Sequence, residues 1–69
     1  MKTFAQNLKK ERMYMGLTQK QFAEKLTIPL ARYKKYECIG KGRRTPDLEM
    51  LVRIAEVLNT TTDELLGKK

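Results

Sequence analysis

The chain has 69 residues, with 15 lysines and arginines against 8 acidic residues, and a formal net charge of +7. A chain of this length forms one domain, and we expect residues 1–69 to constitute it. So small a domain has little room for a deep catalytic cleft, and the absence of histidine removes the usual general base and the commonest transition-metal ligand. The composition therefore argues against an enzyme, a metal site or a cofactor, whereas the positive charge favours a polyanionic partner, nucleic acid before an anionic membrane.

Cys38 is the single cysteine, so no internal disulfide can form, as is usual in cytosolic proteins. No apolar run approaches the ~20 residues that a membrane-spanning helix requires, and the first residues lack the apolar segment of a secretory signal. We therefore expect a cytoplasmic protein, associated with the nucleoid, that has no membrane partner.

The first helix is predicted over residues 3–15. Phe4, Leu8 and Met15 recur at helical spacing and form its apolar face. Gly16 follows, and glycine commonly ends a helix because it adopts the left-handed conformation without strain.

A second helix is predicted over residues 18–26. Thr18 and Gln21 have the spacing of a capping box, in which the threonine hydroxyl accepts a backbone N–H and the glutamine reaches back. Pro29 disfavours helix at the residue before it, so this helix is short, about two turns.

A third helix is predicted over residues 29–38, with Pro29 in its first turn. Tyr33 and Tyr36 share one face and are expected in the core, with stacking on unpaired bases as the alternative. Most of the other side chains fall on the opposite face and should point outward: Leu30, Ala31, Arg32, Lys34 and Lys35.

Residues 39–44 are predicted to form a loop, because Gly40 and Gly42 interrupt regular secondary structure there. The loop is basic because it also contains a lysine and two arginines. The charge is polarised here: residues 30–46 carry six basic groups and one acidic group, whereas residues 47–66 carry one basic group and five acidic groups. The loop cations are either a solvated run or phosphate contacts, and the second interpretation is favoured beside a DNA-reading helix. They are Lys41, Arg43 and Arg44.

A fourth helix is predicted to begin with Thr45 as the N-cap and Pro46 at the first position. Its apolar positions are Leu48, Leu51, Ala55 and Leu58, widened by Val52, Ile54 and Val57. A helix this apolar should be central and buried on much of its circumference.

A second capping box, between Thr61 and Glu64, predicts a short last helix that contains Leu65 and Leu66. No segment shows the alternation of a strand. The fold class is therefore all-α, with five helices.

Two apolar features have competing interpretations. Residues 13–15, Met-Tyr-Met, are expected in the core, with a partner surface as the alternative. Cys38 is expected to be a small buried side chain.

The second and third helices, joined by about three residues, have the spacing of a helix-turn-helix. The major groove of B-DNA is about 12 Å wide and accepts one α-helix. In this motif the first helix crosses the backbone and the second lies in the groove, so cations are expected on the outer face of the second.

The chain resembles the lambda-repressor-like, Cro/C1-type helix-turn-helix family over most of its length. The similar segments are LKKER (8–12), GLTQKQFAEKL (16–26), YE (36–37), PDLEML (46–51) with IA (54–55), and TDELL (62–66). The resemblance implies five helices, with the second and third as the DNA reader, and dimers on two-fold operators.

Carried over by position, the resemblance implies phosphate contacts from Thr18 and Gln19 and a buried ion pair between Arg12 and Glu37. The groove-facing positions are Leu30, Ala31, Arg32, Lys34 and Lys35. This helix opens with Pro-Leu-Ala in place of the family's small polar residues, so contact with thymine methyl groups is expected there instead of amide readout of adenine.

We therefore predict a sequence-specific regulator of transcription, most consistent with a repressor, whose partner is double-stranded DNA and which has no small-molecule substrate. A homodimer, formed in solution or only on DNA, is expected to use the ends of the last helices near Leu58, Leu65 and Leu66. The alternative is a protein-interaction module, antitoxin-like or an adaptor, on the same helical fold.

Overall fold

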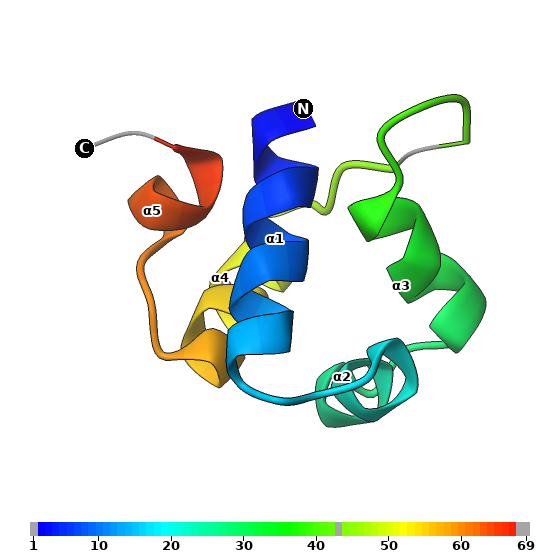
Figure 1. The fold of residues 1–69 in the computed structure, drawn as a ribbon, viewed down its shortest axis with the longest axis horizontal. Coiled ribbons are helices and arrows are strands. Elements are labelled where there is room, and N and C mark those ends of the chain that lie inside the picture. Colours follow the sequence, from blue (N-terminus) through cyan, green and yellow to red (C-terminus); the bar gives the residue numbers. More distant parts are fainter. Residues whose placement is uncertain (1, 43, 68–69) are drawn as a thin grey trace.

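The computed structural model describes residues 2–42 and 44–67. Within these residues the chain forms five α-helices and no strand, which confirms the predicted all-α, lambda-repressor-like fold (Figure 1). The helices are α1 (Lys2–Tyr14), α2 (Gln19–Leu26), α3 (Leu30–Glu37), α4 (Leu48–Leu58) and α5 (Thr62–Leu66).

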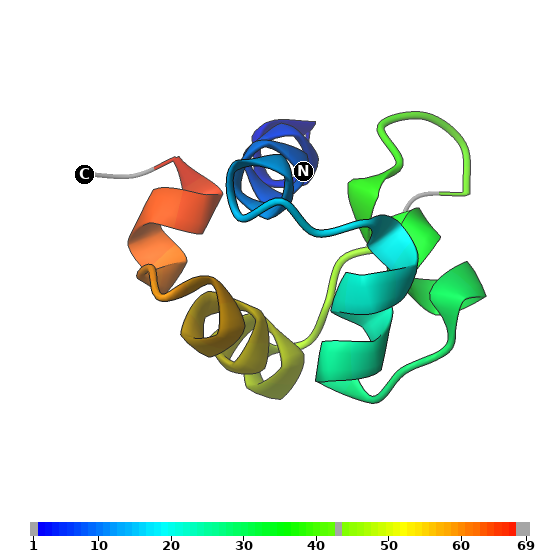
Figure 2. The same cartoon turned by 60° about the horizontal axis from the view of Figure 1, so that its bottom comes forward.

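The central helix is α1, which packs against α5 on one side and α3 on the other (Figures 1 and 2). Its residues Phe4 and Leu8 are almost completely buried. The prediction that the fourth helix is central was wrong, because α4 packs mainly against α2 and α5 and turns one side to solvent. Leu48 is 74% exposed and Val52 is 41% exposed, so the apolar stripe is wider than the face that is covered.

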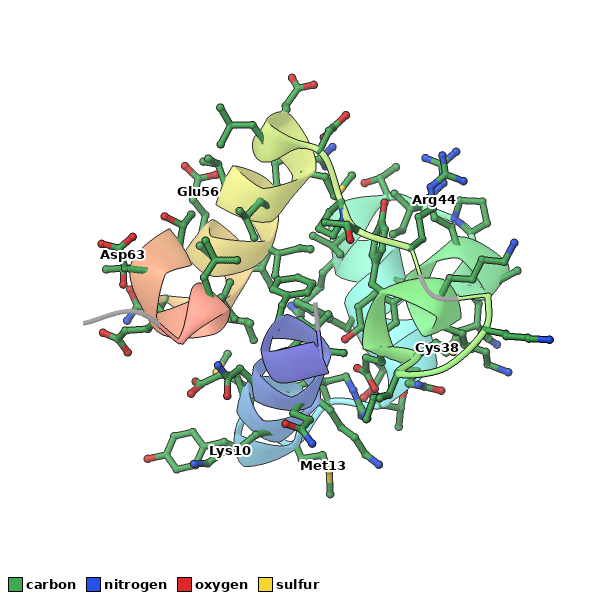
Figure 3. The ribbon with its side chains drawn as sticks, turned by 90° about the horizontal axis from the view of Figure 1, so that it is seen from above. Lys10, Met13, Cys38, Arg44, Glu56 and Asp63 are labelled. Carbon is green, nitrogen blue, oxygen red and sulfur yellow. The ribbon has the colours of Figure 1, made fainter. Side chains whose placement is uncertain are left out.

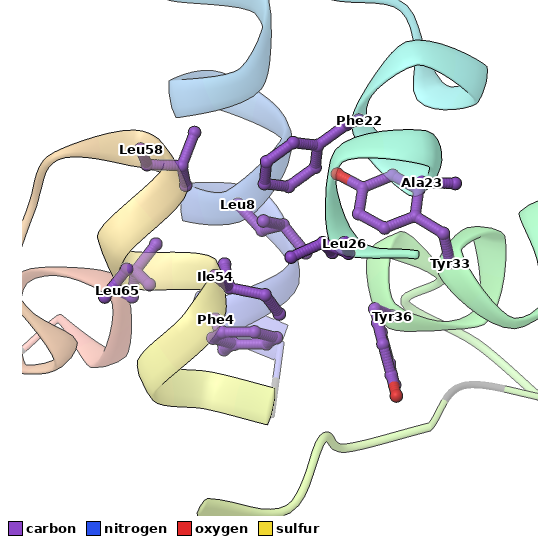
Figure 4. Close-up of a cluster of buried hydrophobic side chains, with 11 residues drawn as sticks. Phe4, Leu8, Phe22, Ala23, Leu26, Tyr33, Tyr36, Ile54, Leu58 and Leu65 are labelled. Carbon is purple, nitrogen blue, oxygen red and sulfur yellow. The ribbon is translucent and has the colours of Figure 1, made fainter. Parts of the chain in front are cut away.

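One continuous core joins all five helices (Figure 4). Tyr33 and Tyr36 both lie in it, as predicted, and Tyr33 packs edge-to-face on Phe22 with ring centroids 5.1 Å apart. Leu58 and Leu65 are also core residues, exposed by 4% and 1%. The predicted dimer surface was therefore wrong at these two positions, since both side chains are already covered by the chain itself.

The capping box of α2 is present in both halves: Thr18 accepts from the Gln21 N–H at 3.1 Å, and Gln21 accepts from the Thr18 N–H at 2.9 Å. The third helix begins one residue later than predicted, because Pro29 has extended backbone and acts as the N-cap.

The start of the fourth helix was also misplaced. Asp47, not Thr45, is the N-cap of α4, since its carboxylate accepts the Met50 N–H at 2.9 Å. In α5, the Thr61 hydroxyl accepts from the Glu64 N–H at 3.1 Å, as the predicted capping box requires. The other half of the box differs, because the Glu64 carboxylate accepts from the Thr60 hydroxyl at 3.1 Å.

The C-terminal end of α1 is exposed, contrary to the expectation of core packing. Met13, Tyr14 and Met15 are 60%, 88% and 45% exposed. The helix ends at Tyr14, and the inward position one turn after Leu8 belongs to Arg12, which is only 8% exposed.

Candidate nucleic-acid interface

A tight turn joins α2 to α3 and sets the angle between them (Figure 2). Thr27 adopts the left-handed conformation (φ 60°), and the N–H of Ile28 donates to the Ala23 carbonyl at 3.1 Å. This bond and the one from the Thr27 N–H satisfy carbonyls at the end of α2, and the chain reverses within three residues. The two short helices therefore have the arrangement of a helix-turn-helix.

The outer face of α3 is exposed and basic. Tyr33 and Tyr36 point into the core, so the residues between and before them project away from it. The exposed side chains, called here the α3 outer face, are Ala31, Arg32, Lys34 and Lys35. Leu30, which was also expected to face the groove, is instead partly buried against the core.

The loop after α3 folds back onto the end of that helix. The N–H groups of Cys38 and Arg44 both donate to the Lys35 carbonyl, at 3.3 and 3.0 Å. Lys41 and Arg44 are exposed, and Figure 3 shows Arg44 on the opposite side of the molecule from Glu56 and Asp63. The loop therefore adds cations beside the α3 outer face, as the charge pattern suggested.

Two predictions for this loop have a different outcome. Arg43, the third predicted phosphate contact, lies outside the described residues. Cys38 is only partly buried, and its thiol lies 3.4 Å from the Lys41 carbonyl, because the chain leaves the core at this point.

Thr18 and Gln19, the predicted phosphate contacts, lie at the start of α2, the first helix of the helix-turn-helix. Thr18 is exposed, and its hydroxyl is occupied by the capping box. The side-chain amide of Gln19 donates to Glu37 Oε1 at 3.1 Å, so its orientation is set by α3. The N–H groups of the first turn still point out of the helix, which is the usual geometry of phosphate binding.

Glu37 is the common acceptor for side chains from three parts of the fold. Arg12 donates to it through Nε at 2.6 Å and through Nη2 at 3.3 Å, while Nη1 donates to the Leu17 carbonyl at 2.7 Å. Gln19 and the Tyr33 hydroxyl complete this group, called here the Glu37 cluster. The Arg12 and Glu37 side chains are only 10% and 4% exposed, so this is a buried ion pair.

Burial and charge perturb two members of the Glu37 cluster. The hydrogen bond to Glu37 raises the pKa of Arg12 above its ordinary value, which keeps the guanidinium charged. Burial, followed by the bond to the Glu37 carboxylate, raises the pKa of Tyr33 far above that of a free tyrosine. Tyr33 therefore stays neutral and remains a donor.

Comparison with known proteins is consistent with this geometry. The sequence profile of the helix-turn-helix family matches residues 8–65. The chain belongs to this family. The match confirms the resemblance noted from the sequence, and it spans all of α2 through α4.

Several curated proteins are similar to this helix-turn-helix chain. The cryptic phage CTXphi transcriptional repressor RstR of Vibrio cholerae is 40% identical over 63 residues, which cover 91% of this chain and 54% of that protein. The HTH-type transcriptional regulator ImmR of Bacillus subtilis is 38% identical over 66 residues, covering 96% and 50%. The uncharacterized HTH-type transcriptional regulator YqaE of the same organism is 41% identical over 63 residues, covering 91% and 52%.

The chain thus spans about half the length of the curated relatives that it matches. No solved structure matches it with significance. Among its described residues, no helix is long and apolar enough to cross a membrane.

Within this helix-turn-helix fold, the structure leaves Arg32, Lys34 and Lys35 exposed on α3 and joins the Arg44 backbone to the end of that helix. Sequence reasoning missed two members of the Glu37 cluster, Gln19 and Tyr33. Tyr33 and Glu37 are four residues apart on one helix, and this spacing was an available signal for the hydrogen bond between them. No local pattern signals the bond from Gln19, since it joins residues 18 positions apart.

Proposed function

We propose that this chain binds double-stranded DNA sequence-specifically and regulates transcription, as a repressor at a two-fold site. The observation that carries the proposal is the α3 outer face, where three cations project away from the core on the second helix of the motif. The names of two relatives, a transcriptional repressor and an HTH-type regulator, support it. In this proposal the protein acts by binding rather than by catalysis, and it is located in the cytoplasm in association with the nucleoid.

In the proposed complex, α3 lies in the major groove. Arg32, Lys34 and Lys35 donate to base edges, for which guanine O6 and N7 are the preferred acceptors, and Ala31 packs on thymine methyl groups. Leu30, half-buried, contributes at the edge of this surface.

Phosphate contacts hold the complex in register. The first turn of α2, with Thr18 and Gln19, directs N–H groups at one phosphate. The loop after α3 supplies Lys41 and Arg44, together with Arg43.

Two copies are proposed to occupy the two half-sites, which lie about one helical turn, roughly 34–36 Å, apart in dimers of this motif. Leu66 is the partly exposed member of the apolar set at the end of the chain's last helices. Sedimentation velocity with and without operator DNA distinguishes a dimer in solution from one that assembles on DNA.

Selection of bound sites from a random DNA pool, followed by gel shifts over a salt series, tests the function. Lys35→Ala should relax base preference at one position, whereas Arg44→Ala should weaken all sequences alike and flatten the log–log salt slope by about one unit per subunit. Lys25→Ala, an exposed lysine at the far end of α2, is the control. No shift at low salt would refute DNA binding, and equal slopes for wild type and Arg44→Ala would refute the loop contact.

The second candidate is a protein-interaction module. The exposure of Met13 and Tyr14 favours it, because large apolar side chains on a surface commonly mark a partner site. Absence of any DNA shift, together with saturable binding of a protein partner at these residues, would select it.

A further inference from the structure

A groove of about 530 Å³ opens between α1 and the segment that follows α3. Ala5 and Met13 line it from α1, and Ile39 lines it from the loop. The DNA contacts proposed above use none of these three residues. Figure 3 shows Met13 and Lys10 projecting from α1.

The floor of this α1 groove is apolar. Met13 is 60% exposed and Ile39 is 46% exposed, so each leaves apolar surface in water, which is unfavourable. Glu37 also lines the groove, but Arg12, Gln19 and Tyr33 already donate to its carboxylate. The Glu37 carboxylate therefore needs no partner from a bound ligand, and the floor of the groove offers an apolar contact.

The rim of the α1 groove is positively charged. Lys9 and Lys10 both line it and both are exposed. Neither forms an ion pair among the described residues, where the single ion pair joins Arg12 and Glu37. A partner that fits must therefore combine apolar side chains with carboxylates.

The dimensions fit a helix. Ala5 and Met13 are eight residues apart on α1, which at 1.5 Å per residue corresponds to about 12 Å, or roughly two helical turns. Apolar side chains at positions i, i+4 and i+7 of a partner helix cover this length. Methionine is suited to such a contact because its unbranched side chain adapts to different partners.

We propose that the α1 groove binds an acidic amphipathic helix of another protein, with apolar side chains against Met13 and Ile39 and carboxylates over Lys9 and Lys10. A second copy of this chain fits less well. The exposed face of α4, with Leu48 and Val52, would meet the groove head-to-tail, and such contacts give a ring or an open filament instead of a two-fold dimer.

This docking site also bears on DNA binding, a consequence that rests on the proposed function. Ile39 lies two residues after the end of α3, and Lys41 lies two residues further along the loop proposed to hold phosphates. An acidic helix in the α1 groove places negative charge beside that loop. We therefore expect its binding to lower the affinity for DNA.

The test uses a phage-displayed library of random 16-residue peptides selected against the intact chain. Enriched peptides should carry net negative charge and apolar residues at helical spacing. Their affinity should fall about tenfold or more for Ile39→Asp, the size of effect expected for an anchoring contact. Lys9→Glu should also weaken them. Met15→Asp is the matched control, because Met15 is 45% exposed but does not line the groove.

Equal affinity for Ile39→Asp and wild type, or no enriched pattern, would overturn the docking site. Self-association of the chain that Ile39→Asp abolishes would overturn the choice of partner. Displacement of operator DNA by the selected peptides supports the regulatory link, and binding without displacement refutes that link alone. Peptides that bind a chain showing no DNA shift would leave the groove established and refute the proposed function.

Discussion

Replacing Arg12 with methionine tests the buried ion pair directly. The substitution keeps a long apolar side chain but removes both donors to Glu37 and the donor to the Leu17 carbonyl. Glu37, whose side chain is 4% exposed, would keep only Gln19 and Tyr33 as partners. Removing one partner of a buried ion pair costs about 3–5 kcal/mol, because the remaining charge is left uncompensated.

This loss is large relative to the whole. A domain of 69 residues has a free energy of unfolding of roughly 3.5–10 kcal/mol, at 0.05–0.15 kcal/mol per residue. A loss of about 3 kcal/mol should lower Tm by roughly 12–24 °C, since each kcal/mol corresponds to about 4–8 °C in domains of this size. Arg12→Met should thus be marginally folded at 37 °C.

Urea and thermal unfolding followed by circular dichroism give the free energy of unfolding and Tm. An unchanged slope of this free energy against urea concentration shows that the variant exposes the same surface on unfolding as wild type. Lys10→Met is the control, an exposed cation on the same helix that should change stability by less than about 0.5 kcal/mol. The double variant with Glu37→Leu should be more stable than the sum of the single losses predicts. An Arg12→Met variant as stable as Lys10→Met would refute the reasoning.

Three further outcomes are expected. Thr27→Gly should raise stability by about 0.5–1 kcal/mol, because a β-branched residue at φ 60° is strained, whereas Asn59→Gly, at φ 55°, should be nearly neutral. Between pH 10 and 12 wild type should lose stability relative to Tyr33→Phe by up to about 1.4 kcal/mol per pH unit, because tyrosine ionises only in the unfolded chain there; parallel pH profiles would contradict this. Asn7→Ala should cost about 1 kcal/mol and speed amide exchange in α5, since the Asn7 amide donates to two carbonyls at the end of that helix; unchanged exchange would exclude this role.

The features that could be predicted from the sequence are mostly local. Thr18 and Gln21 satisfy each other within one turn, so their spacing was sufficient to place the start of α2. The inward position of Tyr33 and Tyr36 followed from helical periodicity in the same way. The family resemblance supplied the pairing of Arg12 with Glu37, which periodicity does not reveal.

The features that could not be predicted depend on what packs where. Val52 continues an apolar stripe, yet it is exposed because no other helix covers that side of α4. Met15 also continues a stripe, but the helix ends before it, and the buried position belongs to Arg12. Competition between two capping residues, Thr45 and Asp47, was decided by which side chain reaches a first-turn N–H.

The Glu37 cluster has a consequence for the entropy of recognition. Donors from α1, α2 and α3 meet on one carboxylate, so α3 cannot tilt or slide without breaking bonds to both neighbours. In the proposed complex, the α3 backbone that enters the DNA major groove is therefore already held by these bonds before binding, and the motion lost on binding should be mainly that of the long side chains of Arg32, Lys34 and Lys35. Ordering each of these side chains costs about 0.5–1.5 kcal/mol. Because the helix itself is already ordered, the total entropic cost of ordering the protein on DNA should be small.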